Sequence, residues 1–596
     1  MDKIQTLKQD LFLKFQIQKP DDIFMEKIWK IKSSKDNFNF KLAEKYHPII
    51  LNLLAGRGIV EEREIEKYFS FNYEKDLSNP FLLTDMDKAT ERILEAKNKK
   101  EKIAIFGDYD ADGVTASAIL YETLASLGIK NIICYIPDRQ SEGYGMNEKA
   151  IKYLFQQKVN LIITVDCGIT NLLEVEKAKK LKIDIVITDH HHIPSKIPEA
   201  CAVVNPNREK NNPNTKKLAG VGVAFKLAQA LYQKIAPEKT EQLKWALDLV
   251  AIGTIADCVS LLGENRILTK YGLIVISKTK RLGLKEIFQV GRIEISENNI
   301  PDTHKVAFQI APRINAAGRM DHASAAYNLL IEKNLAKARE MALELENKNQ
   351  ERQKITKEIF REVKILAENS FKDKKFIFAE NLHWPVGILG LVAGKITEEF
   401  GKPTAIFQKQ KKESVGSFRS VPEVNIIEII EKCSELLTKF GGHSQAAGVS
   451  LPNENIEKLY KKMSGLIEEK LKEKKITSEI RIDAEIKAED INWELVNGIK
   501  KMEPFGEGNM EPIFCAKNLI VIDAKIVGNG QKHWKLSLQG EIGSPKIFDS
   551  IGFSLVENFP NLRKNDKINI VFSIQEDKWN GNKKIQLKLI DLRVIE

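Results

Sequence analysis

Three carboxylates stand at alternate positions early in the chain: Asp108, Asp110 and Asp112, within the segment FGDYDADG. The apolar residues 102–106 just before them have the pattern of a buried β-strand, and a helix is expected to follow. Mg²⁺ and Mn²⁺ prefer hard oxygen ligands such as carboxylates. Alternating acids between a strand and a helix therefore predict a metal site.

Acidic and imidazole side chains also follow two later strands. Residues 161–166 form an apolar run that ends on Asp166, and residues 183–188 run into Asp189 and three consecutive histidines. In an open α/β sheet, ligands bind outside the carboxyl ends of the strands, so these side chains are expected to share one cleft. Two divalent ions held there would activate water and bind a phosphate. The candidate ligands are Asp110, Asp112, Asp166 and His190, with Asp257 after a further apolar helix.

The elements that must position these ligands alternate between apolar strands and amphipathic helices. This rhythm predicts a mostly parallel sheet with helices on both faces. Strands are expected at 102–106, 131–137, 161–166, 183–189 and 201–205, and helices at 115–127, 147–157, 171–181, 219–235 and 240–255.

The rest of the chain predicts further domains. Residues 323–369 form a charged helical stretch that is longer than a typical globular helix, which indicates a connection between domains. A second, smaller α/β unit follows, and short alternating strands with glycine-rich turns from 515 onwards predict a β-barrel or sandwich. The expected division is a helical region at 1–95, a catalytic α/β domain at 96–322, a connecting helix at 323–369, a second α/β domain at 370–472 and a β-domain at 473–596.

Length and composition limit the class of protein. At 596 residues the chain exceeds one hydrophobic core, and usual domain sizes predict roughly three to five domains. Hydrophobic residues make up 43% and charged residues 29%, which excludes the disordered class. No apolar run approaches the ~20 residues of a membrane span and no signal-peptide layout is present, so a cytoplasmic location without a membrane partner is expected. Six cysteines form no CxxC pair, and a net charge of +10 permits a polyanionic partner.

Several ordered motifs carry a family resemblance. The segments GDYDADG (107–113), VDCG (165–168), DHH (189–191) and GTIAD (253–257) resemble the motifs of the DHH phosphoesterase superfamily. Four later segments are similar to those of bacterial single-strand-specific exonucleases within the DHH/DHHA1 branch. These are APRINAAGR (311–319), GSFRS (416–420), GGHSQAAG (441–448) and PFGEGN (504–509). The resemblance covers roughly residues 45 to 596.

The resemblance implies a role for each proposed ligand. Asp166 would bridge two ions, Asp112, His190 and Asp257 would bind one of them, and Asp110 the other. His191 would face the scissile phosphate, which makes Asp166 and His191 the expected catalytic residues. Some relatives carry a histidine ligand where this chain has Phe106, so the ion at Asp110 is expected to bind weakly. Asp108 is interpreted as a turn residue, His192 as a packing or supporting residue, and Cys167 and Cys258 as small buried fillers.

The resemblance also implies phosphate-binding residues, because arginine forks and glycine-rich backbone bind phosphate well. The second α/β unit corresponds to a DHHA1 domain that holds the end of the strand, and the terminal domain to an OB-fold. In the terminal domain, Trp534 and Trp579 stand among Lys532, His533, Lys535 and Lys578, and each tryptophan is either a base-stacking or a core residue. The phosphate-binding candidates are Arg139, Arg313, Asn315, Arg319, Ser417, Arg419, Gly441, Gly442 and His443.

The function implied is metal-dependent 5′→3′ hydrolysis of single-stranded DNA to 5′-mononucleotides, in DNA repair and recombination. Mn²⁺ or Mg²⁺ would be the cofactor, in a two-ion site. A single-strand-binding protein and a RecQ-type helicase would be partners of a monomeric enzyme. Two alternatives stay open: a DHH/DHHA1 phosphodiesterase acting on short oligoribonucleotides or cyclic dinucleotides, and a non-catalytic scaffold that binds single strands.

Overall fold

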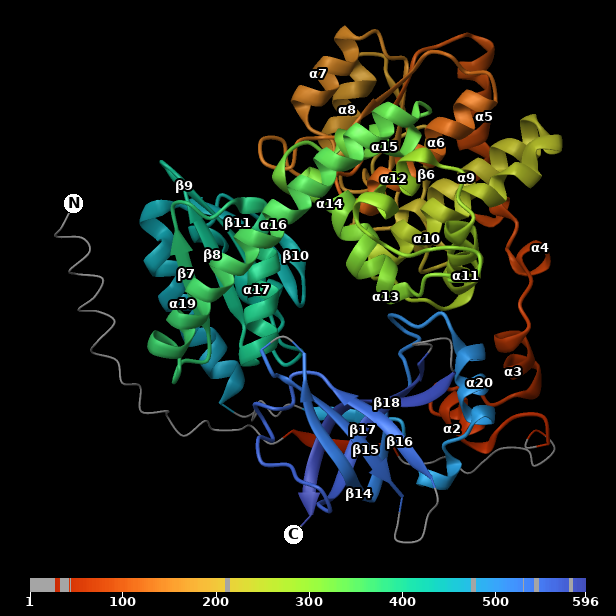
Figure 1. The fold of residues 1–596 in the computed structure, drawn as a ribbon. Helices are drawn as coiled ribbons and strands as arrows, with labels where there is room; N and C mark the ends of the chain where they lie inside the picture. Colours follow the sequence, from red (N-terminus) through yellow and green to blue (C-terminus); the bar gives the residue numbers. More distant parts are fainter. Residues whose placement is uncertain are drawn as a thin grey trace. The chain divides into compact units, whose positions relative to one another are not determined.

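The computed structural model describes residues 27–32, 42, 44–209, 215–472, 479–528, 530–540, 546–577 and 583–595. Figure 1 shows their helices and strands. The chain forms two compact units: one comprises 66–475 with 501–511, and the other comprises residues up to 65 with 476–500 and 512–596. None of the helices in these described ranges is both long and apolar enough to cross a membrane.

A five-stranded parallel sheet organises the first part of the larger unit. Its strand order is β3-β2-β4-β5-β6, and the register pairs Phe106 with Thr164 and Val165 with Thr188. The carboxyl ends of the central strands therefore lie side by side at one edge of the sheet. The predicted parallel α/β sheet is confirmed. The strands are β2 (Ile103–Gly107), β3 (Ile132–Tyr135), β4 (Leu161–Val165), β5 (Asp184–Thr188) and β6 (Ala202–Val204).

Both faces of this sheet are buried under helices. Ile103 and Ile105 pack in one hydrophobic cluster with α6 and α9, whereas Ala104 and Phe106 pack in another with α7 and α8. Burial on both faces explains why the strands are continuous apolar runs rather than alternating ones. The helices are α5 (Met86–Asn98), α6 (Ala111–Ser126), α7 (Glu148–Gln156), α8 (Leu172–Lys180) and α9 (Gly220–Ile235).

Helices make up the next part of the larger unit. The predicted helix at 240–255 is instead a 3₁₀ segment, Pro237–Ala246, followed by α10. A π-helical turn, Val306–Ile310, precedes α14. The elements are α4 (Tyr73–Asp76), α10 (Leu247–Ala256), α11 (Gly263–Ser277), α12 (Leu282–Val290), α13 (Thr303–Lys305), α14 (Ala311–Met320), α15 (Ser324–Ile331) and α16 (Leu335–Ser370).

The expected connecting helix at 323–369 is two helices, α15 and α16, and this corrects the prediction. The side chain of Glu332 accepts from the backbone N–H groups of Lys333 and Asn334, and the Asn334 side chain accepts from Lys337 N. These side-chain bonds end one helix and cap the next. The second helix, α16, is 36 residues long.

The second α/β part of the larger unit is built on a mixed sheet. Its strand order is β10-β11-β9-β8-β7, in which only β7 and β8 pair in parallel among the described strands. The predicted smaller α/β domain is confirmed. Its elements are β7 (Ile377–Asn381), α17 (Val386–Phe400), β8 (Thr404–Lys409), β9 (Glu413–Arg419), α18 (Ile426–Glu431), β10 (Lys439–His443), β11 (Ala446–Pro452) and α19 (Ile456–Leu471).

The other unit contains the predicted β-barrel. Strands follow the order β14-β15-β16-β18-β17, and pairing of β14 with β17 closes the barrel. The elements are β13 (Ala484–Glu485), α20 (Trp493–Met502), β14 (Phe514–Val527), β15 (His533–Gln539), β16 (Ile547–Gly552), β17 (Lys567–Asp577) and β18 (Lys584–Ile595).

The N-terminal region differs from the helical region expected at 1–95. It contains a strand, β1 (Ile28–Ile31), which pairs in parallel with β12 (Glu479–Ile482), besides helices α2 (Pro48–Ala55) and α3 (Glu62–Phe69). The Trp29 indole N–H donates to Asp591 Oδ2 at 2.8 Å, and the Arg593 guanidinium lies 4.5 Å from the Trp29 ring centre. These contacts with the last strand explain why the residues around β1 belong to the C-terminal unit.

Candidate metal centre

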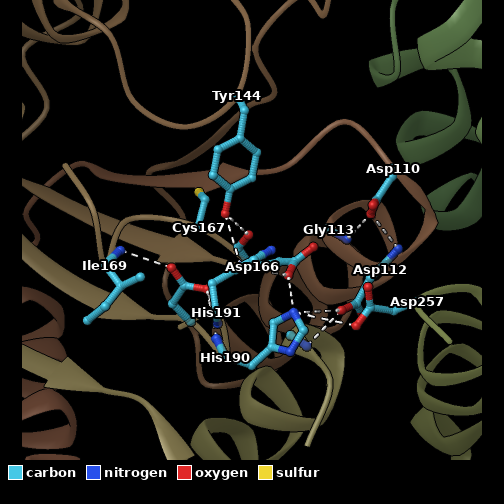
Figure 2. A network of polar contacts seen from close by, with 12 residues as sticks. Asp110, Asp112, Gly113, Tyr144, Asp166, Cys167, Ile169, His190, His191 and Asp257 are labelled. Carbon is cyan, nitrogen blue, oxygen red and sulfur yellow. Dashed lines mark hydrogen bonds and ion pairs between the residues drawn. The ribbon is translucent and has the colours of Figure 1, made fainter. Parts of the chain in front are cut away.

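The predicted ligands meet at the carboxyl edge of the parallel sheet (Figure 2). His190 Nε2 lies 3.1 Å from Asp166 Oδ1, 3.5 Å from Asp257 Oδ2 and 3.9 Å from Asp112 Oδ2. Asp166 follows β4, His190 follows β5, and Asp257 follows α10. Residues far apart in sequence are thus brought together, as predicted from the strand ends.

Three overlapping groups have ligand atoms that all lie within 4.8 Å of one another. One group matches the set predicted for a single ion. Another contains Asp108, which the sequence interpretation gave a turn role; its buried Oδ1 makes no hydrogen bond within the described chain, so we propose Asp108 as a further ligand. The groups are Asp112, His190 and Asp257; Asp108, Asp110 and Asp166; and Asp166, His190 and His191.

The donor set fits a hard divalent cation. Four buried polar atoms of the cluster have no hydrogen-bond partner among the described residues: Asp108 Oδ1, Asp166 Oδ1, His190 Nε2 and Asp257 Oδ2. Buried polar atoms without partners are costly, so such a concentration in one place indicates a ligand-binding site. Carboxylates with one imidazole are the donors that Mn²⁺ and Mg²⁺ accept.

Backbone groups hold the carboxylates in place. Both oxygens of Asp112 accept from the first turn of α9, from Gly220 N at 2.7 Å and Val221 N at 2.8 Å. Asp110 caps α6, because its Oδ1 accepts from the backbone N–H groups of Asp112 and Gly113. A Cβ on Gly220 would lie 2.4 Å from Asp166 Oδ1, so only glycine allows α9 to approach so closely.

The crowded acids perturb one another's pKa values. Burial and the charge of Asp110 raise the pKa of Asp112 to about 7. Burial and the charges of Asp112 and Asp110 raise the pKa of Asp257 to about 9, and burial with the same neighbours raises the pKa of Asp166 well above its usual range. Bound divalent cations would reverse this trend by favouring the ionised carboxylates.

His191 is oriented by a buried carboxylate and a tyrosine. Its Nδ1 lies 2.8 Å from Asp189 Oδ1 and 3.0 Å from the Tyr144 hydroxyl, which donates to the Asp166 carbonyl. Burial would lower the pKa of His191, but the hydrogen bond and charge of Asp189 raise it to about 9. Since Nδ1 is engaged, Nε2 is the nitrogen left for a substrate. The sequence interpretation missed Tyr144, although its setting in the segment EGYG marks a glycine-bounded turn.

Phe106 is buried and belongs to a hydrophobic cluster. Its ring stacks on Tyr135 with 5.3 Å between ring centres and packs in the cluster that contains α7 and α8. Asp108 supplies a carboxylate to the group that contains Asp110, which weakens the reason for expecting a poor second ion site. Cys167 is buried as predicted, whereas Cys258 is exposed, so its predicted buried role is wrong. His192 is exposed, which does not fit a packing role, and its supporting role stays a prediction.

Arginines gather beside the acidic cluster. Burial and the nearby charges of Arg139 and Arg352 lower the pKa of Arg319 to about 9, and burial with Arg139 lowers that of Arg419. Arg419 lies next to Ser417 on β9, with 3.4 Å between Nη1 and Oγ. Such a cluster of like charges is a candidate anion site. Arg352, on α16, was missed by the sequence interpretation because it lies outside the quoted motifs.

Other predicted phosphate-binding residues make different contacts. Arg313 forms an ion pair with Glu346 at 2.6 Å and also donates to backbone carbonyls, so we interpret it as structural. Asn315 Oδ1 accepts from Ala111 N at 2.8 Å and thereby supports the acidic segment. The three predicted residues Gly441, Gly442 and His443 are exposed on the edge strand β10 rather than in a turn.

In the terminal domain, Trp534 is a core residue. Its side chain is 4% exposed, and its indole N–H donates to the Phe559 carbonyl at 3.0 Å. The base-stacking alternative is therefore wrong for Trp534. Lys532 and Lys535 beside it are exposed, and His533 is half-buried. Trp579 and Lys578 lie outside the described residues.

A parallel sheet whose strand ends carry these acids and histidines, followed by a second α/β domain, defines a phosphoesterase of the DHH class. Three family models match: "DHH family, N-terminal domain" over residues 102–254, "DHHA1 domain" over 373–469, and "RecJ OB domain" over 482–591. The chain belongs to the RecJ family.

Curated relatives and solved structures agree with this assignment. The single-stranded-DNA-specific exonuclease RecJ of Bacillus subtilis (strain 168) is 35% identical over 98% of this chain and 71% of its own length. The protein of the same description from Escherichia coli (strain K12) is 30% identical over 91% of this chain and 95% of its own. A crystal structure of RecJ in complex with Mn²⁺ from Thermus thermophilus matches with a TM-score of 0.80 and 25% identity, over 96% of this chain and 80% of that one.

Proposed function

We propose that this chain is a metal-dependent exonuclease that hydrolyses single-stranded DNA from the 5′ end and releases 5′-mononucleotides. The observation that carries the proposal is the pair of ligand groups that share Asp166, beside a set of half-buried arginines. Relatives described as single-stranded-DNA-specific exonucleases support the substrate. A RecJ structure with Mn²⁺ supports the cofactor.

The residues of this chain would hold two ions of Mn²⁺ or Mg²⁺. Asp112, His190 and Asp257 would hold one ion, and Asp108 and Asp110 the other. Asp166 would serve both, because it groups with Asp108 and Asp110 and its Oδ1 lies 3.1 Å from His190 Nε2. When bound, such ions make water acidic enough to attack phosphorus and offset negative charge on the phosphate oxygens. Asp108 extends the ligand set expected from the sequence.

His191 would act on the substrate directly. Asp189 keeps the ring in a fixed orientation, and its hydrogen bond and charge raise the pKa of the imidazole and so favour the protonated form. Its Nε2–H would then donate to a non-bridging oxygen of the scissile phosphate. A positively charged donor at this position favours the transition state, in which negative charge on those oxygens increases.

The half-buried arginines would determine from which end the strand is degraded. Arg139, Arg319 and Arg419, with Ser417, would hold the terminal 5′-phosphate beside the ions. Arg139 is partly immobilised, because its guanidinium lies 4.8 Å from the ring centre of Tyr109 between two of the acids. A terminal phosphate held beside the metal centre limits cleavage to the bond next to the end, which gives single nucleotides. The exposed strand with Gly441, Gly442 and His443 would bind the chain further along.

The cellular role and partners are inferred from the family resemblance. We place the enzyme in the cytoplasm, in DNA repair and recombination, with a single-strand-binding protein and a RecQ-type helicase as partners. The helicase would supply single strands from duplex, and the binding protein would keep them unpaired. We also propose that the enzyme acts as a monomer.

A time course with end-labelled substrates tests the proposal. The enzyme would be incubated with Mn²⁺ or Mg²⁺ and single-stranded DNA labelled at either end, beside matched duplex, RNA and a cyclic dinucleotide. Immediate release of labelled mononucleotide from the 5′-labelled single strand alone is expected. Hydrolysis of only the short RNA or the cyclic dinucleotide would support a small-substrate phosphodiesterase, and binding without cleavage a scaffold.

A further inference from the structure

The motif PFGEGN (504–509) has no part in the chemistry described above. It lies in a short segment, 501–511, that belongs to the larger unit, although the chain on both sides of it, 476–500 and 512–596, belongs to the other unit. Residues 501–511 are therefore a short insertion of the larger unit between two segments of the other unit. Their contacts show which part of the larger unit they support.

The segment contacts the loop that carries the proposed ligand Asp257. The backbone N–H of Leu261 donates to the Glu507 carbonyl at 2.7 Å. Gly508 has a φ of +72°, and a Cβ there would lie 2.2 Å from Ser260 Oγ. The backbone of residues 507–508 therefore packs directly on residues 260–261, and the fit depends on glycine at position 508.

A buried asparagine makes the segment rigid. The Asn509 side chain donates to the carbonyls of Met502 at 2.9 Å and Pro504 at 2.8 Å, and its Oδ1 accepts from the Tyr68 hydroxyl at 2.8 Å. The Arg266 guanidinium donates to the same Met502 carbonyl and lies 3.7 Å from the Tyr68 ring centre. The turn thus has a fixed shape before it meets the ligand loop.

The ligand loop is short and is held from two sides. Leu261 lies four residues beyond Asp257. The Ser260 carbonyl accepts from the Asn265 side chain of α11 at 3.0 Å, while Leu261 is bound to the segment. Cys258, which directly follows Asp257, has a φ of +55°, and this indicates a tight turn between the ligand and Ser260. A shift at Leu261 would therefore move Asp257, and ligand positions must be kept to within about 0.5 Å for tight binding.

We propose that residues 502–509 form a positioning element for Asp257 and that they set the metal affinity of the group Asp112, His190 and Asp257. The inference rests on the proposed function to the extent that Asp257 is a metal ligand. It extends that function by assigning a role to a motif that lies outside both α/β domains.

Metal binding by the full-length chain without DNA tests this inference. Isothermal titration with Mn²⁺ would compare the wild type with Asn509→Ala and Gly508→Ala, and with Lys501→Ala as the matched control, since the exposed Lys501 side chain makes none of the contacts above. Residues that orient metal ligands typically contribute 10- to 100-fold to affinity, so we expect Mn²⁺ binding at one site to weaken roughly 10-fold in the first two variants. The control should bind as the wild type does.

A second-site change separates positioning from general damage. Ser260→Ala removes the hydroxyl that a Cβ at position 508 would strike, so the double variant Gly508→Ala with Ser260→Ala should recover part of the lost Mn²⁺ affinity. Thermal unfolding of the metal-free variants would show whether each still folds cooperatively. A variant that is less stable but binds Mn²⁺ with wild-type affinity would overturn the inference.

The same experiment separates failure of the inference from failure of the proposed function. Asp257→Ala gives the loss expected when the ligand itself is removed. If Asp257→Ala binds Mn²⁺ normally, the ligand assignment is wrong. If Asp257→Ala loses one site while both segment variants keep it, only the positioning role is wrong.

Discussion

His190 Nε2 lies 3.1 Å from Asp166 Oδ1, and neither atom has a hydrogen-bond partner in the described part of the chain. Burial and the charge of His191 lower the pKa of His190 to about 4, so its imidazole is neutral near pH 7. A neutral imidazole can present a lone pair to a metal ion, and the carboxylate beside it can bind the same ion. We therefore propose that the two residues share a cation.

The first prediction concerns Asp166, the acid common to two ligand groups. Asp166→Asn should reduce Mn²⁺-dependent nuclease activity more than about 100-fold, because even residues behind the ligands contribute 10- to 100-fold. Asparagine tolerates the φ of +61° at this position, so the fold should be kept. The rate of mononucleotide release from 5′-labelled single strands measures the effect. Asp184→Asn, at the opposite end of β5, should retain activity, and full activity in Asp166→Asn would refute the shared centre.

The second prediction concerns Asp108, whose carboxylate lies in one group with Asp110 and Asp166. Asp108→Asn should raise the Mn²⁺ concentration for half-maximal activity roughly 10-fold, because a buried ligand loses its charge while its shape is kept. The measurement is nuclease rate against Mn²⁺ concentration. Asp138→Asn, whose carboxylate binds Ser141 instead, is the control. An unchanged metal dependence would return Asp108 to a structural role.

The sequence predicted most of this centre because parallel strands deliver their carboxyl ends to one edge. Asp112, Asp166 and His190 each follow a strand that an apolar run marks clearly. Asp108 could not be chosen in the same way, because alternation along a segment does not show which carboxylates lack hydrogen-bond partners. That distinction depends on burial at the end of β2, which only the folded chain shows.

Residue type alone was a poor guide for the arginines and tryptophans. Arg313 and Arg319 lie in the same motif, yet Arg313 pairs with Glu346 from α16 whereas Arg319 lies among other arginines. The partner comes from a distant segment, so the motif could not separate them. The sequence also did not predict that the helical stretch breaks at Glu332. This break depends on side-chain hydrogen bonds to the backbone, which do not change the helical periodicity of the sequence.

The third prediction distinguishes a core role from a base-stacking role for Trp534. Trp534→Phe should lower the free energy of unfolding of the barrel by about 1 kcal/mol, because the hydrogen bond to the Phe559 carbonyl is lost while most packing remains. The affinity for single-stranded DNA should be unchanged. Urea denaturation followed by circular dichroism and fluorescence anisotropy with a labelled oligonucleotide would measure the two. Weaker DNA binding without loss of stability would contradict the core assignment.

The fourth prediction is a pH dependence away from the metal centre. Burial would raise the pKa of Asp85, but its contacts with Arg208, Lys88 and the Val203 N–H lower it overall. Because the pKa of Asp85 is lower in the folded state, its ionised carboxylate stabilises the fold at pH values above the unfolded-state pKa near 3.8. This contribution is lost as the pH falls through the lower, folded-state pKa. Asp85→Asn should therefore cost about 1 kcal/mol at pH 7, after allowance for solvent screening, and progressively less below about pH 4.

Urea midpoints of the wild type and Asp85→Asn at pH 7 and at the lowest pH where both fold would check this. Asp87→Asn, at an exposed carboxylate two residues further along, serves as the control. A difference between wild type and Asp85→Asn that grows as the pH falls would contradict the assignment.

The fifth prediction concerns Arg419, which lies beside Ser417 and near Arg139. If it holds the 5′-phosphate, Arg419→Ala should slow cleavage of a short 5′-phosphorylated strand about 10-fold or more, since a hydrogen bond to a charged group is worth roughly 1.5–3 kcal/mol. The same strand with a 5′-hydroxyl should be affected far less, because it never makes the contact. Arg339→Ala, an exposed position on α16, controls for loss of positive charge. Equal slowing on both strands would mean that Arg419 acts on the reacting phosphate or on folding rather than on the strand end.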